Sequence, residues 1–133
     1  MKDQFKPVVL DSVDVVQKTF DFSLNLIELY IFLVKTNEFD FAERLLKAGT
    51  NIRQNIEQSI VADSKSEFYH KLSLASKDAM EVRYWLKEIQ MKHIMHDCCD
   101  SCVEKINEII KIILYMTQAT FATEVQFNLG NLN

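Results

Sequence analysis

The sequence predicts an all-α protein, an antiparallel up-down-up-down four-helix bundle, on three observations. A stripe of seven apolar residues alternates steps of four and three, which keeps one face of a long helix against a partner helix. The only proline is Pro7, and two glycines in 133 residues are too few for the turns of a sheet protein. Long helices joined by short turns make such a bundle. The stripe consists of Phe68, Leu72, Ala75, Ala79, Val82, Leu86 and Ile89.

The first predicted helix spans about residues 15–34 and is apolar on two faces. Such a helix has more apolar surface to bury than one bundle core offers. We therefore expect one face to fill the core and the other to form an oligomer interface, or both to lie deep in the bundle. The core face is predicted to be Phe20, Ser23, Ile27, Tyr30 and Val34, and the candidate interface is Phe22, Leu26, Leu29 and Leu33.

The second predicted helix follows a turn at residues 36–38 and covers about residues 40–60. Gly49 lies inside its apolar stripe, where glycine costs about 1 kcal/mol relative to alanine. We expect this glycine to permit close approach of a neighbouring helix. Asn55 flanks the stripe and is predicted to make a structural hydrogen bond within the core, with a ligand role as the alternative.

The third predicted helix starts after a break at residues 62–66 and reaches about residue 92. Ser64 and Glu67 have the spacing of a capping box, which satisfies backbone N–H groups at a helix start. Trp85 flanks the long stripe of this helix and is predicted to pack at its edge.

The fourth predicted helix begins near residues 100–101. Residues 15–122 are then expected to form the bundle, with 1–14 as an N-terminal extension that docks on it and 123–133 as a tail. In the tail, apolar Val125, Phe127 and Leu129 alternate with polar residues, which indicates a frayed or extended arm. The predicted core contains Leu45, Ile52, Ile56, Phe68, Leu72, Ala79, Val82, Leu86, Ile106 and Ile110.

A cluster of cysteine and histidine precedes the fourth helix. His93, His96, Cys99 and Cys102 step by threes, and Cys-x-x-Cys is a spacing of zinc half-sites. Steps of three drift by about 60° each around a helix, so the first and last side chains would face opposite sides. We therefore expect no metal and no cofactor, with the cysteines as small apolar fillers. A metal or thiol-redox site made of these four residues is the alternative.

Composition narrows the class of protein further. The formal net charge is −4, although residues 44–93 carry nine Lys/Arg against six Asp/Glu. A nucleic-acid-binding protein is expected to have a concentrated basic face, which this balance disfavours. The first residues lack the apolar core of a signal peptide, and the longest apolar-rich stretch, residues 24–34, is too short to span a bilayer. A cytoplasmic protein without membrane contact is expected.

Three segments together resemble the bacterial four helix bundle protein family, which is related to proteins encoded in intervening sequences of large-subunit rRNA genes. The resemblance covers about residues 18–118. Its most specific parts are residues 45–50 with Ile52 and Asn55, and Ser64 and Lys65 with Phe68, Lys71, Ala75 and residues 84–86. It implies a four-helix bundle without enzyme activity that forms homo-oligomers, pentamers among them. It also implies structural roles for Gly49, Asn55, Glu81 and Trp85.

Three functional hypotheses follow. The first is a non-catalytic interaction or accessory module that self-associates and binds an unidentified protein partner. The second is a nucleic-acid-associated accessory protein, because one branch of the resembled family serves a retroelement reverse transcriptase; that branch is strongly basic and this chain is not. The third is a metal or redox protein that uses the cysteine and histidine cluster.

Overall fold

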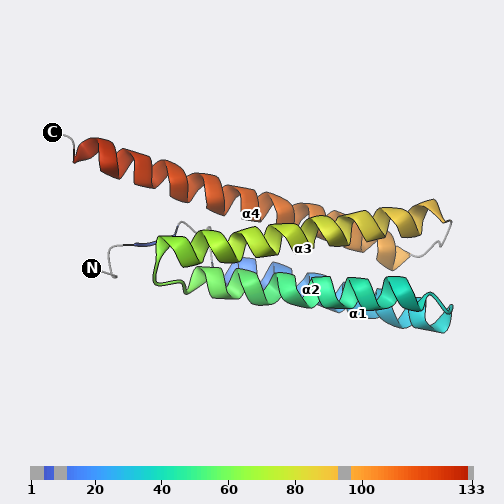
Figure 1. Cartoon of the computed structure of the whole chain (residues 1–133). Helices are drawn as coiled ribbons and strands as arrows, with labels where there is room; N and C mark the ends of the chain where they lie inside the picture. The colour runs from blue at the N-terminus through green and yellow to red at the C-terminus, as the bar shows by residue number, and fades with distance from the viewer. Residues whose placement is uncertain (1–4, 8–11, 93–96, 132–133) are drawn as a thin grey trace.

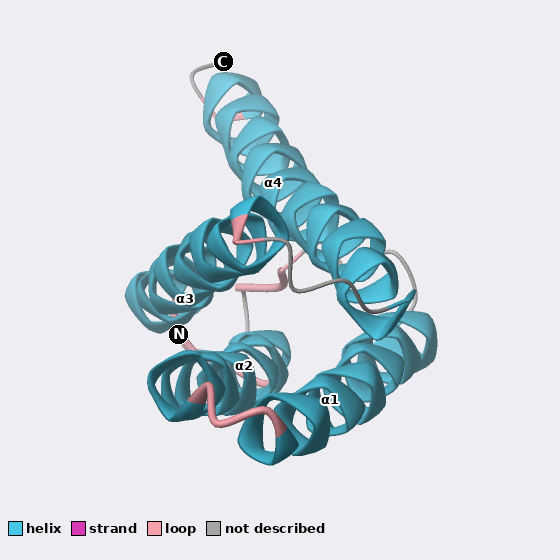
Figure 2. Ribbon diagram, turned by 90° about the vertical axis from the view of Figure 1, so that its right-hand side faces the viewer, coloured by secondary structure: helices cyan, strands magenta, loops and turns pink. Residues whose placement is uncertain are grey.

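The computed structural model describes residues 5–7, 12–92 and 97–131, and it is built from four helices in antiparallel succession (Figure 1). They are α1 (Ser12–Lys35), α2 (Phe39–Ile60), α3 (Lys65–Met91) and α4 (Asp97–Gly130). Contacts join α1 to α2, α2 to α3, α3 to α4 and α4 back to α1. The helices therefore surround one central core, as Figure 2 shows from the end of the bundle. The predicted all-α four-helix bundle is confirmed.

The conformation of the turn between α1 and α2 is fixed by the φ angle of Asn37 and by two backbone hydrogen bonds. Asn37 has a φ of 63°, a left-handed conformation that asparagine tolerates better than most residues. The Glu38 N–H donates to the Leu33 carbonyl at 2.8 Å, and the Asn37 N–H donates to the Val34 carbonyl at 3.2 Å. This pair of bonds is a Schellman motif, which satisfies the last carbonyls of α1 and reverses the chain within three residues.

Ser64 caps the start of α3, which is one of the two hydrogen bonds of the predicted capping box. The Ser64 hydroxyl accepts a hydrogen bond from the Glu67 N–H at 3.1 Å, and Ser64 itself is extended. A side-chain oxygen in this position satisfies one of the backbone donors that a helix start leaves unpaired. The boundary between α2 and α3 therefore follows directly from residues 62–66.

The core is the predicted one. All ten expected core residues are buried, and seven consecutive positions of the α3 stripe are at most 2% exposed. Side chains from α1 complete this core, because Phe22, Leu26, Leu29 and Leu33 are at most 3% exposed. The remaining central positions come from α4, with Cys102, Ile109, Ile113 and Met116.

This burial corrects the prediction for the two faces of α1. Phe22, Leu26, Leu29 and Leu33 were the candidate oligomer interface, but they fill the core of the single chain. The face expected to fill the core instead leaves Phe20 and Ile27 40–46% exposed. The physical reason is size and composition: the buried face offers four large side chains in a row, whereas the other face contains Ser23.

The fourth helix is longer than predicted at both ends. It begins at Asp97, and Cys98 and Cys99 in its first turn are already buried against the bundle. It continues to Gly130, so the tail is neither frayed nor extended over the described residues. Val125 and Leu129 alternate with polar residues, but they are also four apart and thus share a helix face. Over so few residues, the alternation of apolar and polar side chains fits an extended strand and a helix equally well.

Part of the N-terminal extension docks on the bundle. The Phe5 ring lies 5.6 Å from the ring of Phe68 between centroids, at the start of α3. Val8–Leu10, which were expected to take part in this docking, lie outside the described residues. Among the described helices, none has the combination of length and apolar composition that spanning a membrane requires.

Candidate interaction surfaces

The cysteine and histidine cluster is divided by the structure. Cys98, Cys99 and Cys102 are thiols buried on the first turns of α4, whereas His93 and His96 lie outside the described residues. The Cys98 thiol donates to the Asn25 carbonyl of α1 at 2.9 Å, and the Cys99 thiol faces the Leu86 carbonyl of α3 at 3.9 Å. The cysteines thus fasten α4 to its two neighbours, as small side chains at helix contacts do.

Burial also sets the protonation of these thiols. It raises the pKa of Cys99 to about 11, and it raises the pKa of Cys102 and Cys98 above the ordinary value of a thiol. Metal ligation and thiol redox chemistry both need the thiolate. Within the described residues, no three His, Cys, Asp or Glu side chains gather in a way that could hold a metal ion.

Gly49 and Asn55 both lie on α2, one on its buried face and one at the edge of that face. A Cβ atom placed on Gly49 would lie 2.0 Å from Cδ2 of Leu26, so α1 and α2 approach closely there. The Asn55 amide donates to the Asn51 carbonyl at 3.0 Å, one turn earlier in α2. The hydrogen bond is within the helix, and Asn55 is half-buried at the edge of the core.

Glu81 and Trp85 lie on α3 beside α2. Glu81 is exposed and lines a hollow of about 270 Å³ with Asp78 and Lys47. Burial, with the neighbouring charge of Glu81, raises the pKa of Asp78. Trp85 is half-buried next to the hydrophobic core and packs edge-on against Phe41 of α2, with 5.6 Å between ring centroids.

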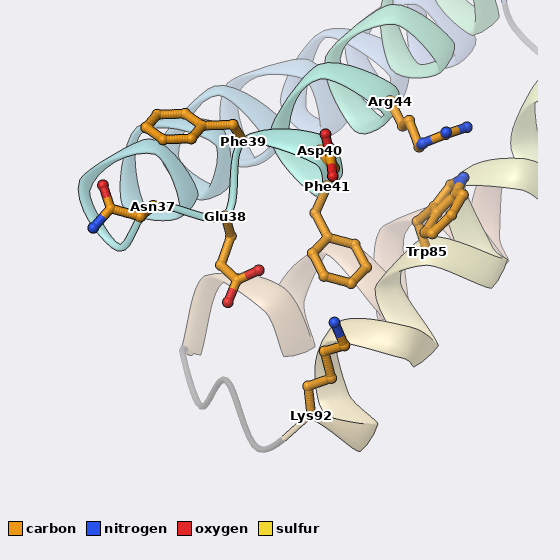
Figure 3. A pocket seen from close by; sticks show the side chains of 8 residues that line it. All are labelled: Asn37, Glu38, Phe39, Asp40, Phe41, Arg44, Trp85 and Lys92. Carbon is orange, nitrogen blue, oxygen red and sulfur yellow. The ribbon is translucent and has the colours of Figure 1, made fainter.

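A pocket of about 380 Å³ surrounds Trp85 where α2 begins and α3 ends (Figure 3). The Arg44 guanidinium lies 4.9 Å from the Trp85 ring, and the Lys92 ammonium lies 4.8 Å from the Phe41 ring. Such cation–π contacts each contribute about 0.5–1 kcal/mol where the cation is exposed. Glu38 and Asp40 balance the two cations on the pocket wall. The arrangement fastens the start of α2 to the end of α3.

A row of exposed apolar side chains lies on the outer side of α1. Phe20, Leu24, Ile27 and Ile31 are 40–50% exposed, and their steps of four, three and four place them on one face. We call these four residues the α1 stripe. Arg53 of α2 borders it, with its guanidinium 5.4 Å from the Phe20 ring and its Nε 3.0 Å from Glu57.

The sequence contained the signal for this surface. Leu24 and Ile31 belonged to neither predicted face, yet with Phe20 and Ile27 they repeat the spacing that identifies the α3 core stripe. Spacing alone does not say which of several apolar faces of a helix turns inward. A large contiguous patch of exposed apolar side chains is one mark of an interaction site.

The fold and these surfaces define an all-α, four-helix-bundle protein. The family model of the 23S rRNA-intervening sequence protein matches residues 11–115, so the chain belongs to that family. The chain is also similar to a crystal structure of a protein of unknown function from the S23 ribosomal protein family of Bacteroides thetaiotaomicron. That similarity has a TM-score of 0.69 and 33% identity over 75% of this chain and 94% of the other. No curated protein matches this chain.

Proposed function

We propose that this chain is a non-catalytic interaction module that acts by self-association, and that the α1 stripe forms its contact surface. The observation that carries the proposal is the exposure of four large apolar side chains in one row, Phe20, Leu24, Ile27 and Ile31. Burying such a side chain fully contributes about 1.5–3 kcal/mol relative to leaving it in water. Because the four side chains are already half-buried, covering each of them contributes less than this to the free energy of association, and the four contributions add up.

The composition of α1 supports an interface. Between Phe22 and Val34 the only charged side chain is Glu28, although a quarter of the whole chain is charged. Depletion of charged residues is what distinguishes the centre of a protein interface from the rest of a surface. The buried cysteine thiols with raised pKa values support a role without thiol or metal chemistry. Reduced thiols also suit the cytoplasmic setting that we propose for the protein.

A nucleic-acid-associated role has less support. The aromatic rings of Phe41 and Trp85 are each covered by a cation, and Glu38 and Asp40 stand beside them. A single-strand binding surface needs open rings on which bases stack, within a positively charged groove. The net charge of −4 also disfavours binding to the negatively charged backbone of a nucleic acid.

The proposal is tested by placing a charge on the stripe and measuring molar mass by sedimentation equilibrium. Ile27→Glu should convert the assembly into monomers of 15.5 kDa or weaken it at least tenfold, because a carboxylate would be buried in the contact. The matched control is Met80→Glu on α3, since Met80 is 44% exposed and Ile27 is 46% exposed.

The control should assemble as the unaltered protein does. A monomeric unaltered protein, or an Ile27→Glu variant that assembles normally, would contradict the proposal. Leu29→Glu is unsuitable for this test, because Leu29 is completely buried and a charge there would unfold the bundle.

A further inference from the structure

A surface that is both apolar and basic lies along the line where α3 and α4 meet. Its apolar side chains are 44–56% exposed, and cations stand around them. We call this surface the α3–α4 seam. It consists of Lys77, Met80, Arg83 and Tyr84 of α3 with Lys111 and Leu114 of α4.

A cross-helix contact places these residues on the adjoining sides of the two helices. Gln90 of α3 donates a hydrogen bond to the Asp100 carboxylate of α4 at 3.1 Å. Arg83 precedes Gln90 by seven residues, about two turns, and therefore lies on the same side of α3. Lys111 and Leu114 follow Asp100 by about three and four turns, so they continue the same edge of α4.

The register brings the two sets of side chains to the same level. The pair just described fixes one level of α3 against α4, and the ion pair of Lys65 with Glu124 at 3.2 Å fixes another. Ten residues from the first pair along each helix, Met80 is level with Ile110, and Lys111 follows at once. The seam is therefore one continuous surface with Met80 near its centre.

The cations of the seam form no ion pair within the part of the chain that the structure describes. The ion pairs there are those of Lys18 with Glu108, Arg53 with Glu57 and Lys65 with Glu124. The guanidinium of Arg83 instead donates to the sulfur of Met80 at 3.1 Å.

The carboxylates near the seam stand apart from its centre. Asp78 and Glu81 lie on the α2 side of α3, where they line a hollow with Lys47. Glu88 and Glu104 lie towards the end of the seam beyond Tyr84. The surroundings of Met80 are therefore positively charged, although the whole chain has a net charge of −4.

The composition of the seam is that of a protein interface. Tyrosine, methionine and arginine are enriched at protein interfaces, and tyrosine and arginine are frequent among the residues that contribute most to binding. Methionine adapts its shape to different apolar partners. A partner that covers this surface needs apolar side chains at its centre and carboxylates around them, because complementary charge gives an interface its specificity.

We propose that the α3–α4 seam binds an acidic amphipathic helical segment of a different protein. Apolar side chains of that segment pack on Met80, Tyr84 and Leu114, and its carboxylates pair with Lys77, Arg83 and Lys111. Two adjacent helices present a straight surface on which a third helix can pack. The inference goes beyond the proposed self-association, because the seam shares no residue with the α1 stripe.

A nucleic acid fits the seam less well than an acidic protein segment does. Bases stack on flat rings, and the centre of the seam contains Met80 and Leu114, which have none. A phosphate backbone would pair with the cations and leave these apolar side chains uncovered.

The test uses two synthetic helical peptides of about 18 residues with leucine along one face. One has glutamate on both flanks of the leucine row, and the other has lysine in the same positions. Fluorescence anisotropy of each labelled peptide measures its binding to the full-length protein. The glutamate peptide should bind more tightly than the lysine peptide, although the net charge of −4 alone would favour the lysine peptide.

Two full-length double variants locate the binding surface. Lys77→Glu with Lys111→Glu should weaken binding of the glutamate peptide at least about tenfold and strengthen binding of the lysine peptide. Lys35→Glu with Lys47→Glu makes the same change of charge at exposed positions outside the seam, and it should bind the glutamate peptide as the unaltered protein does. Helix content by circular dichroism checks folding; where the seam variant loses helix content, Lys111→Glu alone replaces it.

Two single variants separate this inference from self-association. Met80→Glu should lose binding of the glutamate peptide and still assemble, because Met80 lies in the seam and outside the α1 stripe. Ile27→Glu should lose assembly and still bind the peptide. A monomeric unaltered protein that binds the glutamate peptide through the seam would refute self-association and support the present inference.

Four results would overturn the inference. The lysine peptide could bind the unaltered protein as tightly as the glutamate peptide, or the seam variant could bind the glutamate peptide no more weakly than the control variant does. The seam variant could also become monomeric while the control variant assembles, which would make the seam a contact between copies. Finally, labelled polyuridylate RNA could bind the unaltered protein and not the seam variant, which would make the seam a nucleic-acid surface.

Discussion

Gly49 offers the sharpest test of how α1 and α2 pack. A methyl group on Gly49 would lie 2.0 Å from Cδ2 of Leu26 and 3.6 Å from the ring of Phe22. Leu26 is only 3% exposed, so its side chain cannot turn out into water to make room. Gly49→Ala therefore forces either an unfavourable Leu26 rotamer or a shift of the two helices.

The magnitude follows from two opposing contributions. Overpacking a well-filled core costs about 1–3 kcal/mol. Replacing glycine by alanine inside a helix gains about 1 kcal/mol. We expect Gly49→Ala to change the free energy of unfolding by between about 0 and −2 kcal/mol, and Gly49→Leu to destabilise by more.

Urea unfolding followed by circular dichroism measures this, at one protein concentration because association adds to apparent stability. Gly130→Ala is the control, since nothing lies within 4 Å of a Cβ atom there. Combining Gly49→Ala with Leu26→Ala should cost less than the two changes separately, because the new methyl group occupies the space that leucine leaves. A Gly49→Ala variant that gains the full helix-propensity increment would refute the close packing.

Three further predictions concern the core and the thiols. Leu72→Ala should cost about 2–5 kcal/mol in urea unfolding, because Leu72 is 2% exposed in the centre of the core; a loss below half of 1 kcal/mol would contradict its core position. The free energy of unfolding should fall as pH rises from 9 towards 11, since the Cys99 thiol ionises near 9.0 when unfolded and near 11 when folded, and Cys99→Ala should reduce that slope. Purified protein should contain far less than one zinc per chain by elemental analysis, and a chelator should leave its thermal melt unchanged, whereas stoichiometric zinc would restore the metal-site alternative.

The parts of the fold that could be predicted are those where local chemistry and packing agree. The α3 stripe, the Ser64 cap and the turn at residues 36–38 each identify one structure, because periodicity and capping residues point to the same boundary. Gly49 could be assigned to a helix contact for the same reason. Its partner, Leu26, could not be named, since that requires the register of α1 against α2.

The parts that could not be predicted depend on tertiary context. Both faces of α1 are apolar, and only the assembled bundle shows that Leu29 faces the core while Ile27 faces outward. The end of α4 has a pattern that fits a strand over six residues and a helix over fifteen. On α1, the misjudged residues include those whose exposure supports the proposed contact surface.

The central claim is that the chain self-associates, and the molar mass of the unaltered protein tests it most directly. Sedimentation equilibrium across the micromolar range should give a weight-average mass that rises with concentration to a multiple of 15.5 kDa. A mass that stays at 15.5 kDa over the whole range would contradict the account, because the α1 stripe would then be exposed to water without a partner.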